Sequence, residues 1–153
     1  MSEQEKQALV TALRLLTATP KSRKGLQDKL KQKGYPPEVL DVTLDRLEKQ
    51  GLLNDRALAQ SLCQSYVNYK FSGRKRIAFE LGKKGIRQNL IHEVLESYSP
   101  EEEKDKALEL AKQKWDRWTR LDKMKRRKKV YDFLLRRGFD FNIARETIDK
   151  LLK

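Results

Sequence analysis

The sequence of 153 residues contains a single cysteine, Cys63, and a single histidine, His92. One cysteine excludes an internal disulfide and is typical of a protein in a reducing cytoplasm. One histidine and one cysteine, expected on different helices, make a poor metal site. We therefore predict a surface or interface position for His92, and a small core position for Cys63 on an apolar helix stripe.

Glycine and proline are also scarce, with seven and four copies, too few for a strand-and-turn protein of this size. No run of 18 apolar residues occurs, so we expect no membrane-spanning segment. The opening Met-Ser-Glu-Gln-Glu-Lys lacks the basic-then-apolar form of a signal peptide. The phosphate-loop pattern GxxxxGK[ST] and the dinucleotide pattern GxGxxG are missing. With no orienting group for a Cys–His nucleophile pair, we predict a cytoplasmic binding protein rather than an enzyme, without cofactors or metal.

Three glycines, Gly34, Gly85 and Gly138, mark an internal repeat with spacings of 51 and 53 residues. Apolar residues recur at matched positions, or columns, which lie eight and four residues before each glycine and one, five and ten residues after it. The columns are Leu26, Ile77, Val130; Leu30, Leu81, Leu134; Tyr35, Ile86, Phe139; Val39, Leu90, Ile143; and Leu44, Leu95, Ile148. A period near 50 residues predicts stacked supersecondary units, none of which buries its apolar face alone.

Helix signals divide each repeat into three helices. Stop signals at Gly34, Gly51, Gly85 and Gly138, and the break at Thr19-Pro20, separate apolar stripes of helical period. We expect N-caps at Ser22, Asn54 or Asp55, Ser72 and Ser99, and a stripe of Leu9, Leu13 and Leu16 on the first helix. The prediction is an all-α fold of three tandem three-helix repeats, resembling helix-turn-helix units, at residues 1–51, 52–98 and 99–153.

The formal net charge of +13 lies in two blocks. Residues 70–89 hold seven Lys or Arg and one acid, and residues 120–137 hold nine and two. These blocks account for the whole excess, so the rest of the chain is neutral. A solvated charged surface is one interpretation; concentration of the charge favours a polyanionic partner, most simply nucleic acid.

Contact residues are expected on the basic helices that precede Gly85 and Gly138. The candidates for nucleic-acid or filament binding are Arg74, Lys75, Arg76, Lys83, Lys84, Arg87, Lys123, Lys125, Arg126, Arg127, Lys128 and Lys129. Phe79 could stack on a base, although packing against a neighbouring repeat is the favoured interpretation. Trp115 is assigned to the core, and Trp118 to either a rim or a stacking position. Since the third helices are acidic or neutral, we expect contacts to the nucleic-acid backbone rather than base reading.

Three stretches together resemble the RecX family of bacterial regulatory proteins. Residues Gly51–Ala59 follow the family pattern Gly-aromatic-Leu-Asp-Asp-x-x-Phe-Ala, with departures at Leu52, Asn54 and Leu58. Residues Gly73–Ile86 follow Gly-x-x-x-Ile-x-x-Glu-Leu-x-x-Lys-Gly-Ile. Residues Tyr131–Phe139 loosely follow an apolar residue, then Phe-Leu-x-x-Arg-Gly-aromatic. The likeness extends over about residues 8–152.

The resemblance implies an elongated, curved array that binds in the groove of the RecA–single-stranded DNA filament. It also implies inhibition of ATP turnover, strand exchange and the co-protease response of RecA, and hence a role in recombination, repair and the SOS response. We expect a monomer. Two alternatives stay open: a sequence-independent nucleic-acid-binding protein, or transcription or RNA-associated factor, of helix-turn-helix type; and an interaction scaffold whose basic blocks meet an acidic protein.

Overall fold

The computed structural model describes residues 1–153, which form nine α-helices and no strands, so the all-α prediction is confirmed. Each unit has three helices. They are α1 (Glu3–Ala18), α2 (Arg23–Gln32) and α3 (Pro37–Lys49) in the first unit, α4 (Asp55–Asn68), α5 (Arg74–Lys83) and α6 (Gln88–Leu95) in the second, and α7 (Pro100–Arg117), α8 (Lys123–Arg136) and α9 (Phe141–Leu151) in the third. No helix is long and apolar enough to cross a bilayer.

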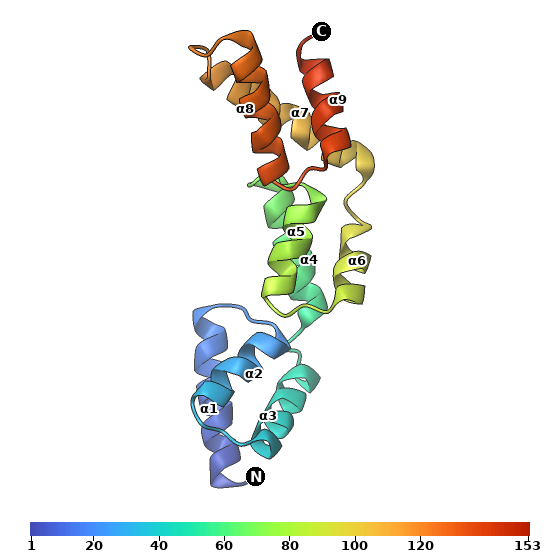
Figure 1. Cartoon of the computed structure of the whole chain (residues 1–153). Coiled ribbons are helices and arrows are strands. Elements are labelled where there is room, and N and C mark those ends of the chain that lie inside the picture. Colours follow the sequence, from blue (N-terminus) through green and yellow to red (C-terminus); the bar gives the residue numbers. More distant parts are fainter.

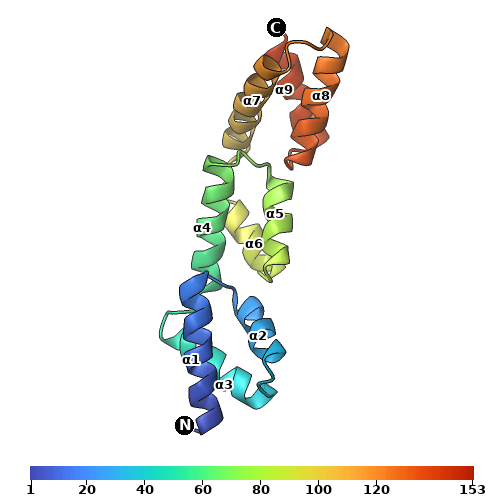
Figure 2. The same ribbon diagram turned by 90° about the vertical axis from the view of Figure 1, so that its left-hand side faces the viewer.

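The three units stack end to end into an elongated array with the two termini at opposite ends (Figure 1). The first helices α1, α4 and α7 follow one another along one side, and α2, α5 and α8 follow one another beside them (Figure 2). The units do not lie on one straight line, and the array bows at the second unit in the view of Figure 1. This arrangement places both basic helices, α5 and α8, in one row.

Each unit has its own hydrophobic core. The matched leucines Leu30, Leu81 and Leu134 are fully buried, one in each core, as the repeat columns predict. Cys63 is 3% exposed within the core of the second unit, which confirms its assignment. The predicted stripe on α1 is wrong at Leu13, which is 38% exposed. The inward face of α1 is centred on the buried alanines Ala8 and Ala12, whose small side chains permit close packing.

Neighbouring units meet through the turns that follow α5 and α8. The turn after α5 packs on the start of α2, where the Ser22 hydroxyl donates to the carbonyl of Lys84. The turn after α8 packs on the start of α5 in the same way. There the N–H of Gly73 donates to the Arg137 carbonyl at 2.7 Å, and the N–H of Lys75 donates to the Gly138 carbonyl at 3.1 Å. The row of second helices is therefore joined by direct hydrogen bonds, from a side chain at the first boundary and from the backbone at the second.

The prediction that Ser72 caps α5 is wrong. Ser72 is buried, Gly73 occupies the N-cap position, and no side chain of this segment caps the helix. The cap comes from the third unit instead, where a carboxylate oxygen of Glu103 accepts the N–H of Arg74 at 2.7 Å. Asp55 of the second unit does the same for α2, accepting the N–H of Arg23 at 2.8 Å. The helices α2 and α5 thus each accept a capping carboxylate from the following unit, in addition to the Ser22 cap of α2. The helix α8 is capped within its own unit by Asp122.

Candidate functional site

Arg74 lies inside the boundary between the second and third units rather than on a free surface. Its guanidinium donates through Nε to Oε1 of Glu103 at 3.3 Å, through Nη1 to the carbonyl of Leu95 at 2.9 Å, and through Nη2 to the carbonyl of Tyr98. The carboxylate of Glu103 is itself buried. These contacts hold the two units together, so the charge of Arg74 is used inside the protein and is not free to bind a nucleic acid.

Arg126 also binds within the third unit. Its Nε donates to the carbonyl of Trp115 at 2.8 Å, and the guanidinium lies 3.9 Å from the centre of the Trp115 ring. Trp115 packs against the core of this unit, in agreement with its core assignment. These contacts fix the start of α8 to the end of α7, so Arg126 stabilises the fold of the third unit.

The other ten predicted cations are on the surface. Glu80 pairs with both Arg76 and Lys83, with N–O distances of 3.2 and 3.8 Å. Asp149 pairs with Arg127, and Asp132 with Lys128. Six exposed cations form no ion pair: Lys75, Lys84, Arg87, Lys123, Lys125 and Lys129. These six charges remain available to an external anion.

Trp118 and Phe133 form an aromatic pair on the third unit, with ring centroids 5.8 Å apart and planes at 82°. Four cations surround the two rings and form no ion pair. Lys129 lies 4.3 Å from the Trp118 centroid, and Lys114, Arg137 and Arg136 lie 4.8, 5.6 and 5.7 Å from that of Phe133. Trp118 is half-buried between Phe133 and Lys129, a rim position that leaves part of its ring accessible.

The cations of this aromatic–basic cluster repel one another. Burial, followed by the charges of Arg117 and Arg137, lowers the pKa of Lys114. Burial and the charge of Arg76 likewise lower the pKa of the Arg137 guanidinium. A polyanion placed on the cluster would relieve this repulsion, because each cation would gain an opposite charge.

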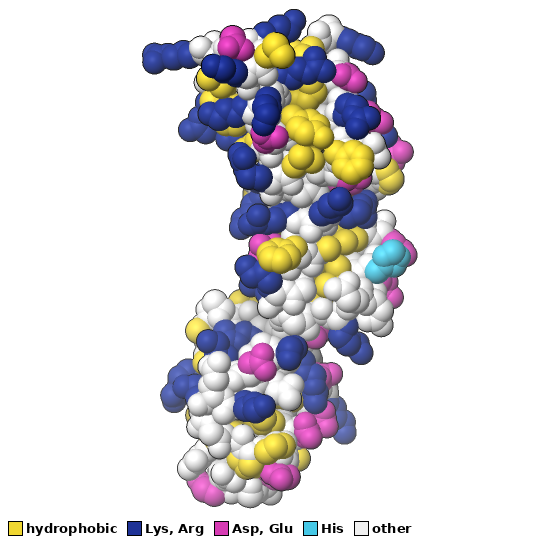
Figure 3. All heavy atoms as spheres, viewed as in Figure 1, with side chains coloured by type: hydrophobic (Ala, Val, Ile, Leu, Met, Phe, Trp, Pro, Cys, Tyr) yellow, Lys and Arg dark blue, Asp and Glu magenta, His cyan; other side chains and the backbone are white.

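One unit boundary brings the two basic blocks of the sequence together. At the boundary of the second and third units, Arg76 from α5 and Arg137 from the end of α8 line one groove of about 450 Å³, together with Lys70 and the exposed Tyr69. Figure 3 shows Lys and Arg side chains crowding over the third unit and along this boundary. Neither Lys70 nor Arg137 is among the predicted contacts.

A second basic groove, of about 330 Å³, lies between the first and second units. Lys21, Lys24 and Lys29 from the first unit meet Lys83 and Lys84 from the second, and Asp28 is the one acid in the lining. Sequence reasoning missed the three lysines of the first unit because acids elsewhere in that unit balance them. These lysines lie beside Lys83 and Lys84 only because the first two units stack end to end. What we call the basic ridge consists of these two grooves, the aromatic–basic cluster and the six free cations Lys75, Lys84, Arg87, Lys123, Lys125 and Lys129.

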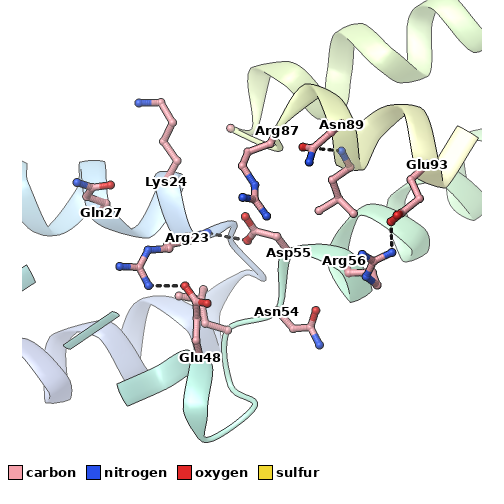
Figure 4. Close-up of a pocket in the computed structure, with 13 residues that line it drawn as sticks. Arg23, Lys24, Gln27, Glu48, Asn54, Asp55, Arg56, Arg87, Asn89 and Glu93 are labelled. Atoms are coloured by element: carbon pink, nitrogen blue, oxygen red, sulfur yellow. Dashed lines mark hydrogen bonds and ion pairs between the residues drawn. The ribbon is translucent and has the colours of Figure 1, made fainter. Parts of the chain in front are cut away.

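The largest cleft, of about 840 Å³, also lies between the first two units but has mixed charge (Figure 4). Arg23 pairs with Glu48 and Asp45, and Arg56 pairs with Glu93. No cluster of three or more His, Cys, Asp or Glu side chains with metal-binding geometry occurs in the chain. His92 lies on the surface of α6, as predicted, 3.9 Å from Glu96. The lining of this cleft holds four basic and three acidic side chains, so its positive excess is only one and attracts a polyanion weakly.

Phe79 differs from its favoured interpretation. We expected it to pack against a neighbouring repeat, but its side chain is 62% exposed on α5, with the ammonium of Lys83 5.4 Å from the ring centroid. The core positions of α5 are taken by Ile77 and Leu81, which lie on the opposite face.

Comparison with known families matches all three units in order. Family models described as the first, second and third three-helix domains of RecX match residues 8–47, 54–95 and 101–148. The regulatory protein RecX of Chlorobium phaeobacteroides (strain BS1) is 35% identical, over 97% of this chain and 96% of that protein. The regulatory protein RecX of Streptomyces lividans is 33% identical, over 96% of this chain and 78% of that protein.

Solved structures show the same architecture. The crystal structure of RecX from Lactobacillus salivarius superposes with a TM-score of 0.88, at 25% identity, over 99% of this chain and 98% of that one. A crystal structure of another regulatory protein RecX gives a TM-score of 0.83, at 26% identity, over 96% of this chain and 72% of that one. This chain therefore belongs to the RecX family of regulatory proteins.

Proposed function

We propose that this chain binds the filament that the recombinase RecA forms on single-stranded DNA, and that it inhibits ATP turnover, strand exchange and co-protease activity. The proposal rests on membership of the RecX family together with the basic ridge. RecA is the partner that the family resemblance implies, and the ridge provides the chemistry for its DNA. Recombination, repair and the SOS response would be the processes affected.

The observation that carries the DNA part of the proposal is the set of cations that form no ion pair within the protein. A folded protein gains little from holding Lys114, Arg136, Arg137 and Lys129 around one pair of aromatic rings, because their charges repel. A phosphate backbone supplies the missing negative charge at regular spacing, and the accessible part of the half-buried Trp118 ring can stack on a base.

Two sites along one ridge suit an extended polyanion better than a compact ligand. The groove at Arg76 and Arg137 lies at the C-terminal end of α8, whereas Lys123 and Lys125 lie at its N-terminal end. A helix of 14 residues separates these ends by about 20 Å. Linked contacts at both places act at high effective concentration, so individually weak contacts sum to useful avidity.

Base reading by a helix-turn-helix unit is less well supported. The third helix of such a unit normally enters the major groove. Here α6 carries no Lys or Arg, and α3 carries four acids against two basic residues. The second helices hold the positive charge instead, which favours contacts to the backbone and binding without sequence preference.

The experiment is to add the purified protein to RecA on single-stranded DNA, and to follow ATP hydrolysis and strand exchange at fixed salt. We expect both activities to fall as the protein is added. Binding should be tighter to the assembled filament than to free RecA or free DNA, because only the filament offers DNA and protein contacts together. Unchanged ATP hydrolysis and strand exchange at saturating protein would refute the proposal.

A further inference from the structure

The outer face of α5 has a composition that the other second helices do not share. Phe79 is at the centre of this face, pointing away from the core residues Ile77 and Leu81, and it is 62% exposed. Lys75 precedes it by one turn, and Lys83 follows by one turn. Phe79 and its two flanking lysines lie along the most exposed side of α5. They therefore contribute nothing to the core of their own unit.

Comparison of the three units shows how unusual Phe79 is. Counted from the glycine that ends each second helix, its equivalents are Asp28 in the first unit and Asp132 in the third. In the third unit Asp132 forms an ion pair at 3.1 Å with Lys128, the equivalent of Lys75. In the second unit an aromatic ring replaces this acid, and Lys75 keeps a free charge. The exchange makes the α5 face more apolar at its centre and more basic at its rim.

Gly82, one turn after Phe79, is the second unusual residue. It lies inside α5, and a Cβ added there would meet no atom within 4 Å. Its equivalents are Lys31 and Leu135, so the unit architecture accepts large side chains at this position. Glycine inside a helix lowers stability, because it loses more backbone freedom on folding than alanine. No internal contact requires Gly82, whereas an external backbone approaching closely would.

We propose that the face formed by Lys75, Phe79 and Gly82 docks a protein segment of the filament: a helix with an apolar side chain over Phe79 and carboxylates beside Lys75 and Lys83. The inference rests on the proposed function. Within the basic ridge it assigns DNA to the aromatic–basic cluster and a protein segment to the outer face of α5, where Lys75 meets a carboxylate instead of a phosphate. Close backbone approach at glycine serves helix packing, while a stacked base needs only the ring. An exposed aromatic with a charged rim has the anatomy of a protein interface.

The test uses three full-length variants: Phe79→Ala, Gly82→Ala, and Leu135→Ala as a control at the third-unit equivalent of Gly82. Their affinity is measured by fluorescence anisotropy for RecA filaments on poly(dT), held with a non-hydrolysable ATP analogue, and for free poly(dT). We expect Phe79→Ala and Gly82→Ala to weaken filament binding about tenfold and to leave poly(dT) binding within about twofold. Gly82→Ala should nevertheless raise the thermal midpoint by about 1–3 °C. Leu135→Ala should leave filament affinity unchanged.

Each other outcome has a distinct meaning. If the parent binds the filament and both α5 variants bind it equally well, the α5 inference is overturned and the proposed function stands. If the variants lose affinity for free poly(dT) to the same extent, the face takes nucleic acid, and the protein-docking inference is also overturned. If the parent itself does not bind the filament, the proposed function fails and the inference falls with it.

Discussion

Glu103 holds both the backbone and the side chain of Arg74. One carboxylate oxygen accepts the backbone N–H at 2.7 Å, and the other lies 3.3 Å from the guanidinium Nε. The same Arg74 guanidinium reaches the carbonyls at the end of the second unit, at Leu95 and Tyr98. This pair thus caps α5 and connects it to α7, making Arg74 a structural residue within a basic block.

Replacing Arg74 should therefore cost stability. Arg74→Ala leaves the buried Glu103 carboxylate with one hydrogen bond, and we expect a loss of about 2–4 kcal/mol in the free energy of unfolding. The neighbouring Lys75→Ala, which removes an exposed cation, should change it by no more than about 0.5 kcal/mol. Urea unfolding followed by circular dichroism measures both. Equal stability of the two variants would show that the Arg74–Glu103 contact does not hold the units together.

The packing of the turn after α8 on the start of α5 predicts a steric effect at Gly73. A Cβ at this position would overlap the carbonyl group of Gly138 and the nitrogen of Phe139. We expect Gly73→Ala to destabilise the protein by about 1–3 kcal/mol, because the turn after α8 must move away. Gly82→Ala is the matched control, since its Cβ would meet open space. A Gly73→Ala variant as stable as the parent would contradict the packing of these two turns.

Alkaline pH should weaken the second unit. Burial raises the pKa of the Cys63 thiol and of the Tyr98 phenol above their ordinary values. The folded state then binds more protons than the unfolded state, in which a thiol titrates at about 8.5. The stabilising contribution is complete below that pH and is lost as the pH rises above it.

Urea midpoints measured between pH 7 and 10 should fall above about pH 8.5. The variant Cys63→Ala should lose most of this decline, because a tyrosine in the unfolded chain titrates at about 10 and Tyr98 therefore contributes only at the upper end of the range. In the native parent, the thiol should react slowly with Ellman's reagent because it is 3% exposed. Rapid modification under native conditions would contradict its burial.

DNA binding should depend steeply on salt and little on sequence. Each phosphate neutralised on single-stranded DNA contributes about −0.7 to the slope of log affinity against log salt. We expect Lys129→Gln and Arg136→Gln, at the aromatic–basic cluster, each to make the slope shallower by about this amount. Lys49→Gln, on the first unit away from the ridge, should leave the slope unchanged. Equal slopes in all variants would place the DNA elsewhere.

The sequence alone was sufficient for the helices and the cores. The columns around Gly34, Gly85 and Gly138 reflect local periodicity. Each unit buries most of its column residues, and Tyr35 and Ile143 are half-buried against their cores. It was not sufficient at the unit boundaries, where partners are distant in the chain. Capping by Ser72 failed because Glu103, from the next unit, supplies the cap.

The candidate surface was predictable in composition but not in geometry. The two blocks of positive charge identified the basic helices. They could not distinguish Arg74 and Arg126, which bind carbonyls inside the protein, from Lys75 and Lys125, which do not. The meeting of Arg76 and Arg137 depends on how units stack, and no local pattern encodes it. The exposure of Phe79 was misjudged because an apolar residue normally indicates packing. The acids Asp28 and Asp132 at the equivalent positions of the other units were the signal that this position faces solvent.

The central claim is that the free cations of the second and third units form the surface through which the protein inhibits the filament. Charge reversal at Lys75, Lys84 and Arg87, and separately at Lys123, Lys125 and Lys129, removes no internal ion pair. Reversal of Lys31, Lys33 and Lys49 on the first unit is the control of equal charge. Helix content should stay unchanged in all three variants.

The deciding measurement is the DNA-dependent ATPase of RecA, titrated with parent and variants at one salt concentration. We predict that each ridge variant inhibits about tenfold more weakly than the parent, that combining the two nearly abolishes inhibition, and that the control inhibits almost as well as the parent. If the combined variant inhibits as strongly as the parent, the basic ridge is not the surface that meets the filament.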